Sequence, residues 1–278
     1  MNARSLPIVG HVAAGEVAPW IERLARVGFA AKGVLYLTIG ALAASAAIGH
    51  GGKSVNDSRG AMGDLLGTQL GRPLLAVIAI GLFGYALWRI IEGFTDPEHR
   101  GRDAKGIAMR IGFVINGLIH LALAGTAASL ALWSRGGGHG SQAKHWTGRA
   151  LEMPGGVYLV YAGAAGVLGY GIYQLYRAWK AKLDKQLRLG ELSSGTRRAV
   201  IAISRFGIAA RALVFGTIGV LLGRAAMHEN PREAGGIRES MRELGSLGKW
   251  PFFVLAVGLG AYGIYQLIAA RYRRVEVR

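Results

Sequence analysis

Arg26-Val27-Gly28-Phe29-Ala30-Ala31-Lys32-Gly33-Val34-Leu35-Tyr36 is the stretch that decides the fold, because the sequence contains it in three versions. The second version runs from Arg110 to His120, and the third runs from Arg205 to Phe215. Each begins with an arginine, has a glycine two positions later and opens a long apolar segment. Self-similarity of this kind predicts that one structural unit is repeated three times.

A second marker, in the other half of each unit, supports the repeat. Gly84-Tyr85-Ala86-Leu87-Trp88 returns at 169–173 and at 261–265, each time with tyrosine second and an aromatic residue last. The opening arginines are 84 and then 95 residues apart, and these tyrosines are 85 and then 92 residues apart. Because both markers shift together, we divide the chain into a cytoplasmic N-terminal segment, 1–21, and three repeats of two helices each. The repeats are 22–98, 99–185 and 186–278, the last with a basic C-terminal tail.

Each repeat contains two apolar segments, and each segment reaches the roughly 20 residues needed to cross the hydrocarbon core of a bilayer. The segments are apolar around nearly the whole helix, which argues against a soluble helical bundle. We therefore predict an all-α membrane protein with six transmembrane helices, formed by three tandem helical hairpins of the same orientation in a pseudo-threefold arrangement. The predicted spans are 27–48, 73–94, 107–133, 154–176, 201–227 and 251–270.

The charge of the chain fits a membrane protein better than a protein that binds nucleic acid. Hydrophobic residues make up 51% of the sequence, the formal net charge is +17, and there is no cysteine for a disulfide or a thiolate metal site. Counted by loop, 18 lysines and arginines lie on the side of the N-terminus and 10 on the other side. By the positive-inside rule, both termini are cytoplasmic. We expect a multi-pass protein of the bacterial cytoplasmic (inner) membrane that binds no nucleic acid.

The loops on the other side of the predicted membrane carry further signals. Residues 60–66 and 239–244 have apolar positions three to four apart, which predicts two short amphipathic helices. The middle loop instead contains the glycine-rich run 136–140, which predicts flexibility.

The repeated motifs resemble those of a known family. The opening R-x-G-[FI]-x-x-x-[GA], the second-helix motif G-Y-x-x-[WY] and the stretch Asn56–Ala61 are similar to the bacterial membrane family catalogued as domain of unknown function 1206. Members of that family carry tandem two-helix units, so the resemblance covers nearly the whole chain. It implies the architecture, and it implies no reaction, ligand or partner.

Polar side chains recur inside the apolar segments at spacings that put them on one helix face. In the first helix of the first two repeats, two such positions are four residues apart and are therefore neighbours, and in the third repeat phenylalanine takes the second position. In each second helix, a glycine, a tyrosine and an arginine or glutamine follow at four-residue intervals, which suits close helix contact and interhelical hydrogen bonds. The candidate ligand- or anion-binding residues are Lys32, Tyr36, Tyr85, Arg89, Asn116, His120, Tyr170, Gln174, Arg211, Tyr262 and Gln266.

These positions allow two interpretations. The helical rise places the polar positions of the first helices and those of the second helices at about the same depth in the inner leaflet. This layer would hold three cations, Lys32, Arg89 and Arg211, and its nearest acid is Glu92. Because charges inside a bilayer are costly, a bound anion would offset the excess. The simpler interpretation is that the cations snorkel to the headgroups and the polar groups join helices. At the interface itself, the expected helix anchors are Arg26, Arg110 and Arg205.

For function, we expect a non-enzymatic protein: a structural or accessory component of the membrane, or one that binds anionic lipid. No catalytic residue, cofactor or metal site is expected, because His120 is the only histidine in a predicted span and the serines there lack a base partner. The expected partners are membrane lipids, anionic ones on the cytoplasmic side, and a complex partner or a homo-oligomer is left open. The alternative is a transporter or channel for anions or small solutes, with its path between the three hairpins.

Overall fold

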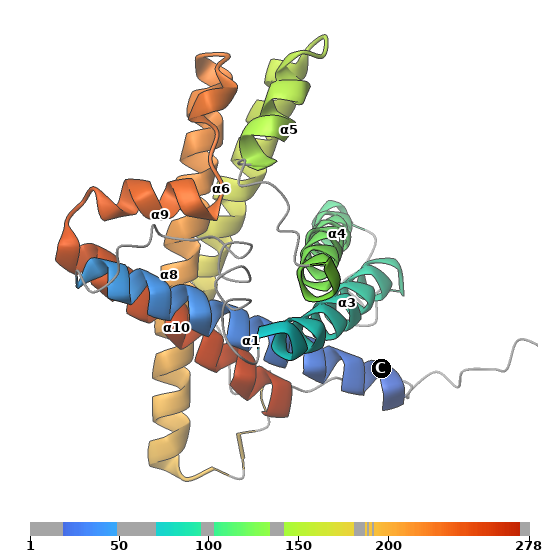
Figure 1. The fold of residues 1–278 in the computed structure, drawn as a ribbon, viewed down its shortest axis with the longest axis vertical. Helices are drawn as coiled ribbons and strands as arrows, with labels where there is room; N and C mark the ends of the chain where they lie inside the picture. Colours follow the sequence, from blue (N-terminus) through green and yellow to red (C-terminus); the bar gives the residue numbers. More distant parts are fainter. Residues whose placement is uncertain are drawn as a thin grey trace, which may run out of the picture.

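The computed structural model describes residues 19–48, 71–95, 103–133, 142–180, 187, 189–190 and 192–272. Within these residues the chain forms six long helices and three short ones (Figure 1). The long helices are α1 (Pro19–Ala47), α3 (Gly71–Thr95), α4 (Ala104–Trp133), α6 (Gly156–Lys180), α8 (Ser194–Met227) and α10 (Lys249–Tyr272). The short ones are α5 (Gln142–Leu151), the 3-10 helix η1 (Pro231–Glu233) and α9 (Ile237–Gly245).

Each long helix coincides with one of the six predicted spans, with its ends shifted by up to eight residues. All six are long and apolar enough to cross a membrane, as the sequence predicted. Gly155 and Gly248 directly precede α6 and α10, and their φ angles are +72° and +122°. Glycine adopts such angles without the steric penalty that a Cβ would bring. The all-α architecture with six candidate membrane-spanning helices is confirmed.

The short helices lie around one end of α8. α9 forms where the sequence predicted an amphipathic helix, and it packs on α8 as η1 and α5 also do. Arg224 of α8 forms ion pairs with Glu233 and with Glu243, at 3.5 and 3.6 Å. The helix α5 was not predicted. The other predicted amphipathic helix, at 60–66, and the glycine-rich run 136–140 lie outside the described residues.

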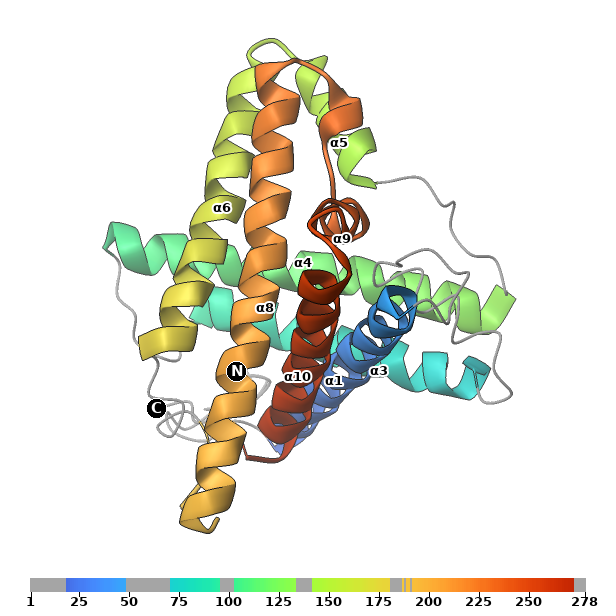
Figure 2. The same ribbon diagram turned by 90° about the vertical axis from the view of Figure 1, so that its left-hand side faces the viewer.

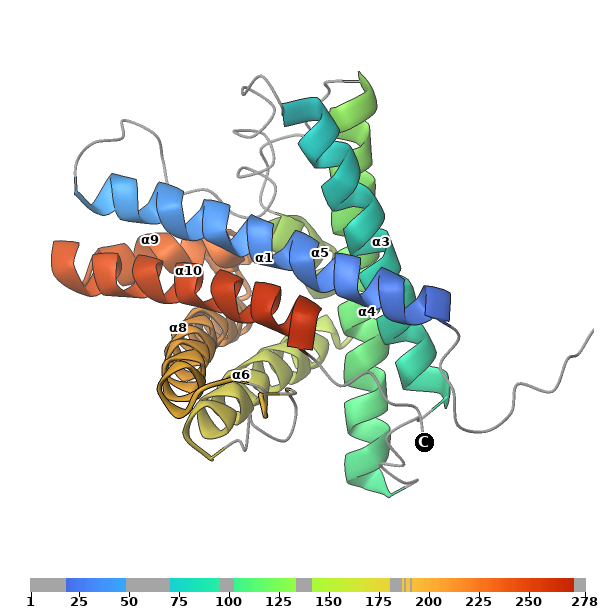
Figure 3. The same cartoon turned by 90° about the horizontal axis from the view of Figure 1, so that it is seen from below.

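The six long helices form three tight pairs, each between helices of different repeats. α1 packs on α10, α3 on α4 and α6 on α8. The second helix of each repeat thus lies against the first helix of the next, and the third repeat closes back onto the first. The pairs cross one another steeply. α6 and α8 run vertically in Figures 1 and 2, and Figure 3 shows α3 crossing α1 while α10 runs alongside α1.

Equivalent small residues bring the backbones together in all three pairs. Between α10 and α1, a Cβ built on Gly263 would lie 2.8 Å from the carbonyl oxygen of Gly33. At the equivalent places, a Cβ on Gly117 would lie 2.9 Å from the oxygen of Ala86, and one on Gly171 would lie 3.1 Å from that of Ala212. Such close approach is what small residues contribute to helix packing in membranes.

Packing within the repeats is less uniform. α1 packs on α3, and α8 packs on α10, but α4 and α6 of the second repeat are not packed on each other in this way within the described residues. The ring of long helices is therefore open between α4 and α6. The pseudo-threefold arrangement stays a prediction, because the second repeat departs from the other two.

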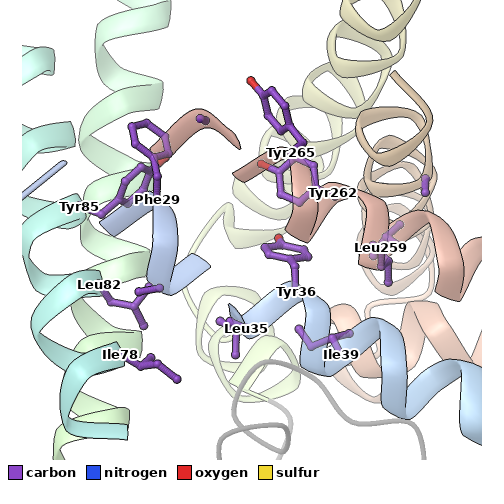
Figure 4. Packing of buried hydrophobic residues seen from close by; sticks show 14 of the residues in the cluster. Phe29, Leu35, Tyr36, Ile39, Ile78, Leu82, Tyr85, Leu259, Tyr262 and Tyr265 are labelled. Carbon is purple, nitrogen blue, oxygen red and sulfur yellow. The ribbon is translucent and has the colours of Figure 1, made fainter. Parts of the chain in front are cut away.

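The buried core follows the closed part of this ring. Figure 4 shows Tyr36 and Ile39 of α1 beside Tyr262 and Leu259 of α10. On the other face of α1, the core residues come from α3. The tyrosines of this core lead to the group of polar residues described next.

Candidate functional site

Polar and aromatic side chains from all six long helices meet inside the bundle, in a group that we call the central cluster. Hydrogen bonds, ring contacts and charge interactions link its members across the three repeats. The central cluster consists of Lys32 and Tyr36 (α1), Tyr85, Arg89 and Glu92 (α3), His120 (α4), Tyr170 and Gln174 (α6), Arg211 and Phe215 (α8) and Tyr262 (α10).

Arg211 contacts all three repeats from its position on α8. Its Nε donates to the hydroxyl of Tyr36 and its Nη1 to the hydroxyl of Tyr170, both at 3.1 Å. Its guanidinium carbon lies 4.4 Å from the ring centre of Phe215 and 5.0 Å from that of Tyr262. Aromatic faces attract cations, so the four rings form a cage that holds the guanidinium in place.

One kind of ring contact recurs at the three interfaces between repeats. In each pair, a tyrosine from the second-helix motif meets the last residue of the next opening stretch. The rings meet edge-on or tilted, which is a favourable aromatic geometry. This explains why that last position is tyrosine, histidine or phenylalanine. The pairs are Tyr262–Tyr36, Tyr85–His120 and Tyr170–Phe215, with ring centres 4.7, 4.7 and 5.2 Å apart.

The first repeat contributes two cations and one carboxylate. The Nζ of Lys32 lies 4.2 Å from the ring centre of Tyr85. Arg89 donates from Nε to the Tyr85 hydroxyl at 2.8 Å and from Nη1 to the carboxylate of Glu92 at 2.6 Å.

The central cluster carries more positive than negative charge. Its three cations face one carboxylate, Glu92, which already pairs with Arg89. Each charge inside a bilayer costs about 2.5–3.5 kcal/mol even on the permissive insertion scale. Of the five N–H donors of a guanidinium, those on Nη2 of Arg211 have no acceptor among the described residues. A guanidinium in this state can take a phosphate or carboxylate oxygen.

The amide side chains predicted for the site differ in their placement. Gln174 is buried, and its Nε2 donates to the Tyr170 hydroxyl at 3.0 Å. The Oδ1 of Asn116 is buried without a donor in the described chain, which costs about 1–3 kcal/mol. Gln266 is buried on α10, and its side chain makes no hydrogen bond with any of the described residues. The structure therefore joins Gln174 to the cluster and does not join Asn116 or Gln266.

The expectation that the cations snorkel to the headgroups is wrong for Lys32 and Arg211. Both side chains are buried, and their charged groups lie over aromatic rings inside the bundle. The positions of Lys32 and Arg211 along their own helices indicated that both lie near the membrane surface, but neighbouring helices cover these side chains. The other half of that interpretation, hydrogen bonds between helices, holds for Arg211, which joins α8 to α1 and α6.

Two of the three predicted anchors cap the end of a helix in another repeat. Arg26 donates from Nη1 to the carbonyl of Ala270 at 2.9 Å, and Arg110 donates from Nε to the equivalent carbonyl of Gly93 at 2.8 Å. Both carbonyls lie near helix C-termini, where the chain leaves acceptors unsatisfied. Arg205 makes no such bond to α6 within the described residues and instead lines an open apolar groove of about 830 Å³. Contact of the three arginines with headgroups stays a prediction.

Glu92 and Phe215 belong to the cluster but were not among the predicted site residues. Phe215 is apolar, and the available signal was its equivalence to Tyr36 and His120 in the repeat. Glu92 had been noted only as the nearest acid, although it follows Arg89 by one helical turn. Within the described ranges, no group of three or more His, Cys, Asp or Glu is placed to hold a metal ion.

These observations define the class of the protein: a multi-pass helical membrane protein built from tandem two-helix repeats. The family described as Domain of Unknown Function (DUF1206) matches the chain three times, over residues 27–96, 111–181 and 206–273. The chain belongs to this family, which confirms the resemblance and the three repeats. It is also 30% identical over 262 residues to a protein of Bacillus subtilis (strain 168) described as uncharacterized protein YxxB, with 94% of each chain covered. No solved structure matches the chain.

Proposed function

We propose that this protein is a non-enzymatic membrane component that binds the anionic group of a membrane lipid in its central cluster. The proposal rests on Arg211, whose side chain is buried and pairs with no carboxylate of the described chain. Its Nη2 group has no acceptor among the described residues. The planar fork of a guanidinium matches phosphate oxygens. The hydroxyls of Tyr36 and Tyr170, each 3.1 Å from a nitrogen of Arg211, hold the guanidinium in one orientation.

The distribution of charge supports an anionic lipid as the source of this group. We place the protein in the bacterial inner membrane, with the side that carries 18 lysines and arginines in the cytoplasm. Basic segments at that surface attract anionic lipids. The orientation has a direct test, because the chain has no cysteine of its own. Ser246→Cys, between α9 and α10, should react with a membrane-impermeant maleimide added outside the cell, and Arg278→Cys should not. The reverse pattern would refute this orientation.

Lipid binding is tested by comparing Arg211→Gln with Arg224→Gln, a variant of the same helix outside the cluster. Each protein is purified from bacterial membranes in mild detergent, and the phospholipid that it retains is identified by native mass spectrometry. We expect the parent and Arg224→Gln to retain an anionic phospholipid, and Arg211→Gln to lose it. Thermal unfolding of each variant shows that it is folded. Equal retention by Arg211→Gln would refute the proposal.

A free anion and a lipid headgroup offer the same phosphate chemistry, so the measurement includes inorganic phosphate. Phosphate that displaces the lipid would show that both compete for the cluster. Phosphate flux into proteoliposomes, lost in Arg211→Gln, would replace the binding proposal with the transport alternative.

A further inference from the structure

The second repeat differs from the first and the third in the space between its two helices, α4 and α6, which are not packed on each other. In the first repeat, a Cβ on Gly28 would collide with Tyr85, and in the third a Cβ on Gly207 would collide with Tyr262. The equivalent Gly112 of α4 has nothing within 4 Å in the described chain. The second repeat therefore has the glycine and the tyrosine of this packing motif without the packing itself.

Exposure of equivalent side chains shows the same difference. Leu35 and Val214 are each 2% exposed, whereas the equivalent Ile119 of α4 is 54% exposed. For the motif tyrosine, Tyr85 and Tyr262 are 1% and 5% exposed, whereas Tyr170 of α6 is 37% exposed. Figure 3 shows α4 and α6 apart. We call the uncovered faces the seam, which is lined by Gly112, Ile115 and Ile119 of α4 and by Gly166 and Tyr170 of α6.

Tyr170 belongs both to the seam and to the central cluster. The hydroxyl of Tyr170 accepts hydrogen bonds from Arg211 and from Gln174. On α4, Asn116 follows Ile115, and its buried Oδ1 has no donor among the described residues. The exposed Ile115 and Ile119 match an acyl chain, and the guanidinium that bonds to Tyr170 matches an anionic headgroup.

We infer that an anionic phospholipid enters the central cluster laterally through the seam and is held with an acyl chain between α4 and α6. The inference rests on the proposed function and adds the route and the binding position. Charge decides the occupant: a helix of a second copy would cover Ile115 and Ile119 but would bring no anion to Arg211.

One disulfide can close the seam, because the chain has no cysteine to interfere. Ile115→Cys with Gly166→Cys joins positions equivalent to Ala31 and Gly81, and a Cβ on Gly81 would lie 2.7 Å from that of Ala31. The full-length protein is reconstituted into vesicles of phosphatidylglycerol and phosphatidylcholine, oxidised, extracted and examined for bound lipid. We expect closure to lower phosphatidylglycerol retention at least about tenfold, corresponding to about 1.4 kcal/mol, and reduction to restore it. The single variant Gly166→Cys, treated with the same oxidant, is the control and should retain the lipid, because this position has nothing within 4 Å in the described chain.

A second variant decides the question if the seam pair does not oxidise. Gly166→Trp fills the seam from a position that has nothing within 4 Å in the described chain, and we expect the same loss of phosphatidylglycerol. If the blocked variants retain the lipid while Arg211→Gln loses it, the lateral route is wrong and the proposed function stands. If Arg211→Gln also retains it, the proposed function fails. Disulfide-linked dimers of the single variant Ile115→Cys in vesicles would show that a second copy covers the seam, and would overturn the inference.

Discussion

Arg211 donates from Nε to the hydroxyl of Tyr36, which is 3.1 Å away and 175 residues earlier in the chain. Both residues belong to the opening stretch, but at positions where its three versions differ. Arg211 corresponds to Lys32 and Asn116, and Tyr36 corresponds to His120 and Phe215. The bond between the third repeat and the first therefore depends on what distinguishes the repeats, whereas their shared glycines provide the helix packing.

Replacing Tyr36 by phenylalanine should lower the free energy of unfolding by about 1.5–3 kcal/mol, because a hydrogen bond to a charged group is lost in the interior. The ring contact with Tyr262 remains in this variant. Thermal unfolding in detergent measures the effect. Tyr265→Phe is the matched control, because the Tyr265 hydroxyl has no hydrogen bond in the described chain although the residue is buried. Equal losses in the two variants would contradict the importance of the Arg211 bond.

Alanine substitutions at the three equivalent glycines should change the stability of the protein by different amounts. Gly28→Ala and Gly207→Ala force α3 and α10 away from their neighbours, which should cost about 1–3 kcal/mol. Gly112→Ala meets no neighbour and removes a glycine from a helix, so it should be neutral or stabilise the protein by up to about 1 kcal/mol. Chemical unfolding of the three variants checks this order. A cost at Gly112 that matches the other two would show that the seam is packed in the membrane.

Arg26→Gln should loosen the end of α10, because the side chain donates to the carbonyls of Ala270 and Arg271 there. Bonds from a charged donor contribute about 1.5–3 kcal/mol. Hydrogen exchange followed by mass spectrometry should show faster exchange in the last turn of α10. Arg205→Gln serves as the control, since Arg205 has no such bond to α6 in the described chain, and its effect on α6 should stay within about 0.5 kcal/mol.

Glu92→Gln should destabilise the protein by about 1.5–3 kcal/mol, because the partly buried guanidinium of Arg89 loses its hydrogen bond to a charged carboxylate. The double variant Arg89→Gln with Glu92→Gln should recover most of this loss. Glutamine already occupies the position of Arg89 in the other repeats, as Gln174 and Gln266. A double-mutant cycle on unfolding free energies measures the coupling. Additive losses would mean that the two residues do not act as a pair.

The spans were predictable because the hydrocarbon core permits few solutions for the backbone. Their ends were not, because the apolar signal stops where the membrane stops, while a helix continues as long as its local chemistry permits. α8 begins seven residues before its predicted span. Its first turn is capped by Ser193, whose Oγ accepts from the backbone N–H of Thr196 at 3.3 Å.

The candidate site was predictable in part, for a similar reason. Spacing along single helices identified Lys32, Tyr85 and Arg211 as inward-facing polar positions, and these residues meet in the central cluster. Spacing gave no information about partners on other helices. The pair of Arg211 with Tyr170 joins two repeats, and Phe215 takes part only because the guanidinium lies over its ring.

By itself, the sequence determined the three repeats, the six apolar helices and the polar positions inside them, because these depend on periodicity and on the hydrophobicity of short stretches. Only the tertiary structure decided which helices pair, and it pairs second helices with the first helices of the next repeat. Gly28 and Gly112 show the physical reason. They stand in nearly the same local sequence, yet one is packed against Tyr85 and the other faces the open seam. Contacts between distant helices decide that difference, and no local pattern contains them.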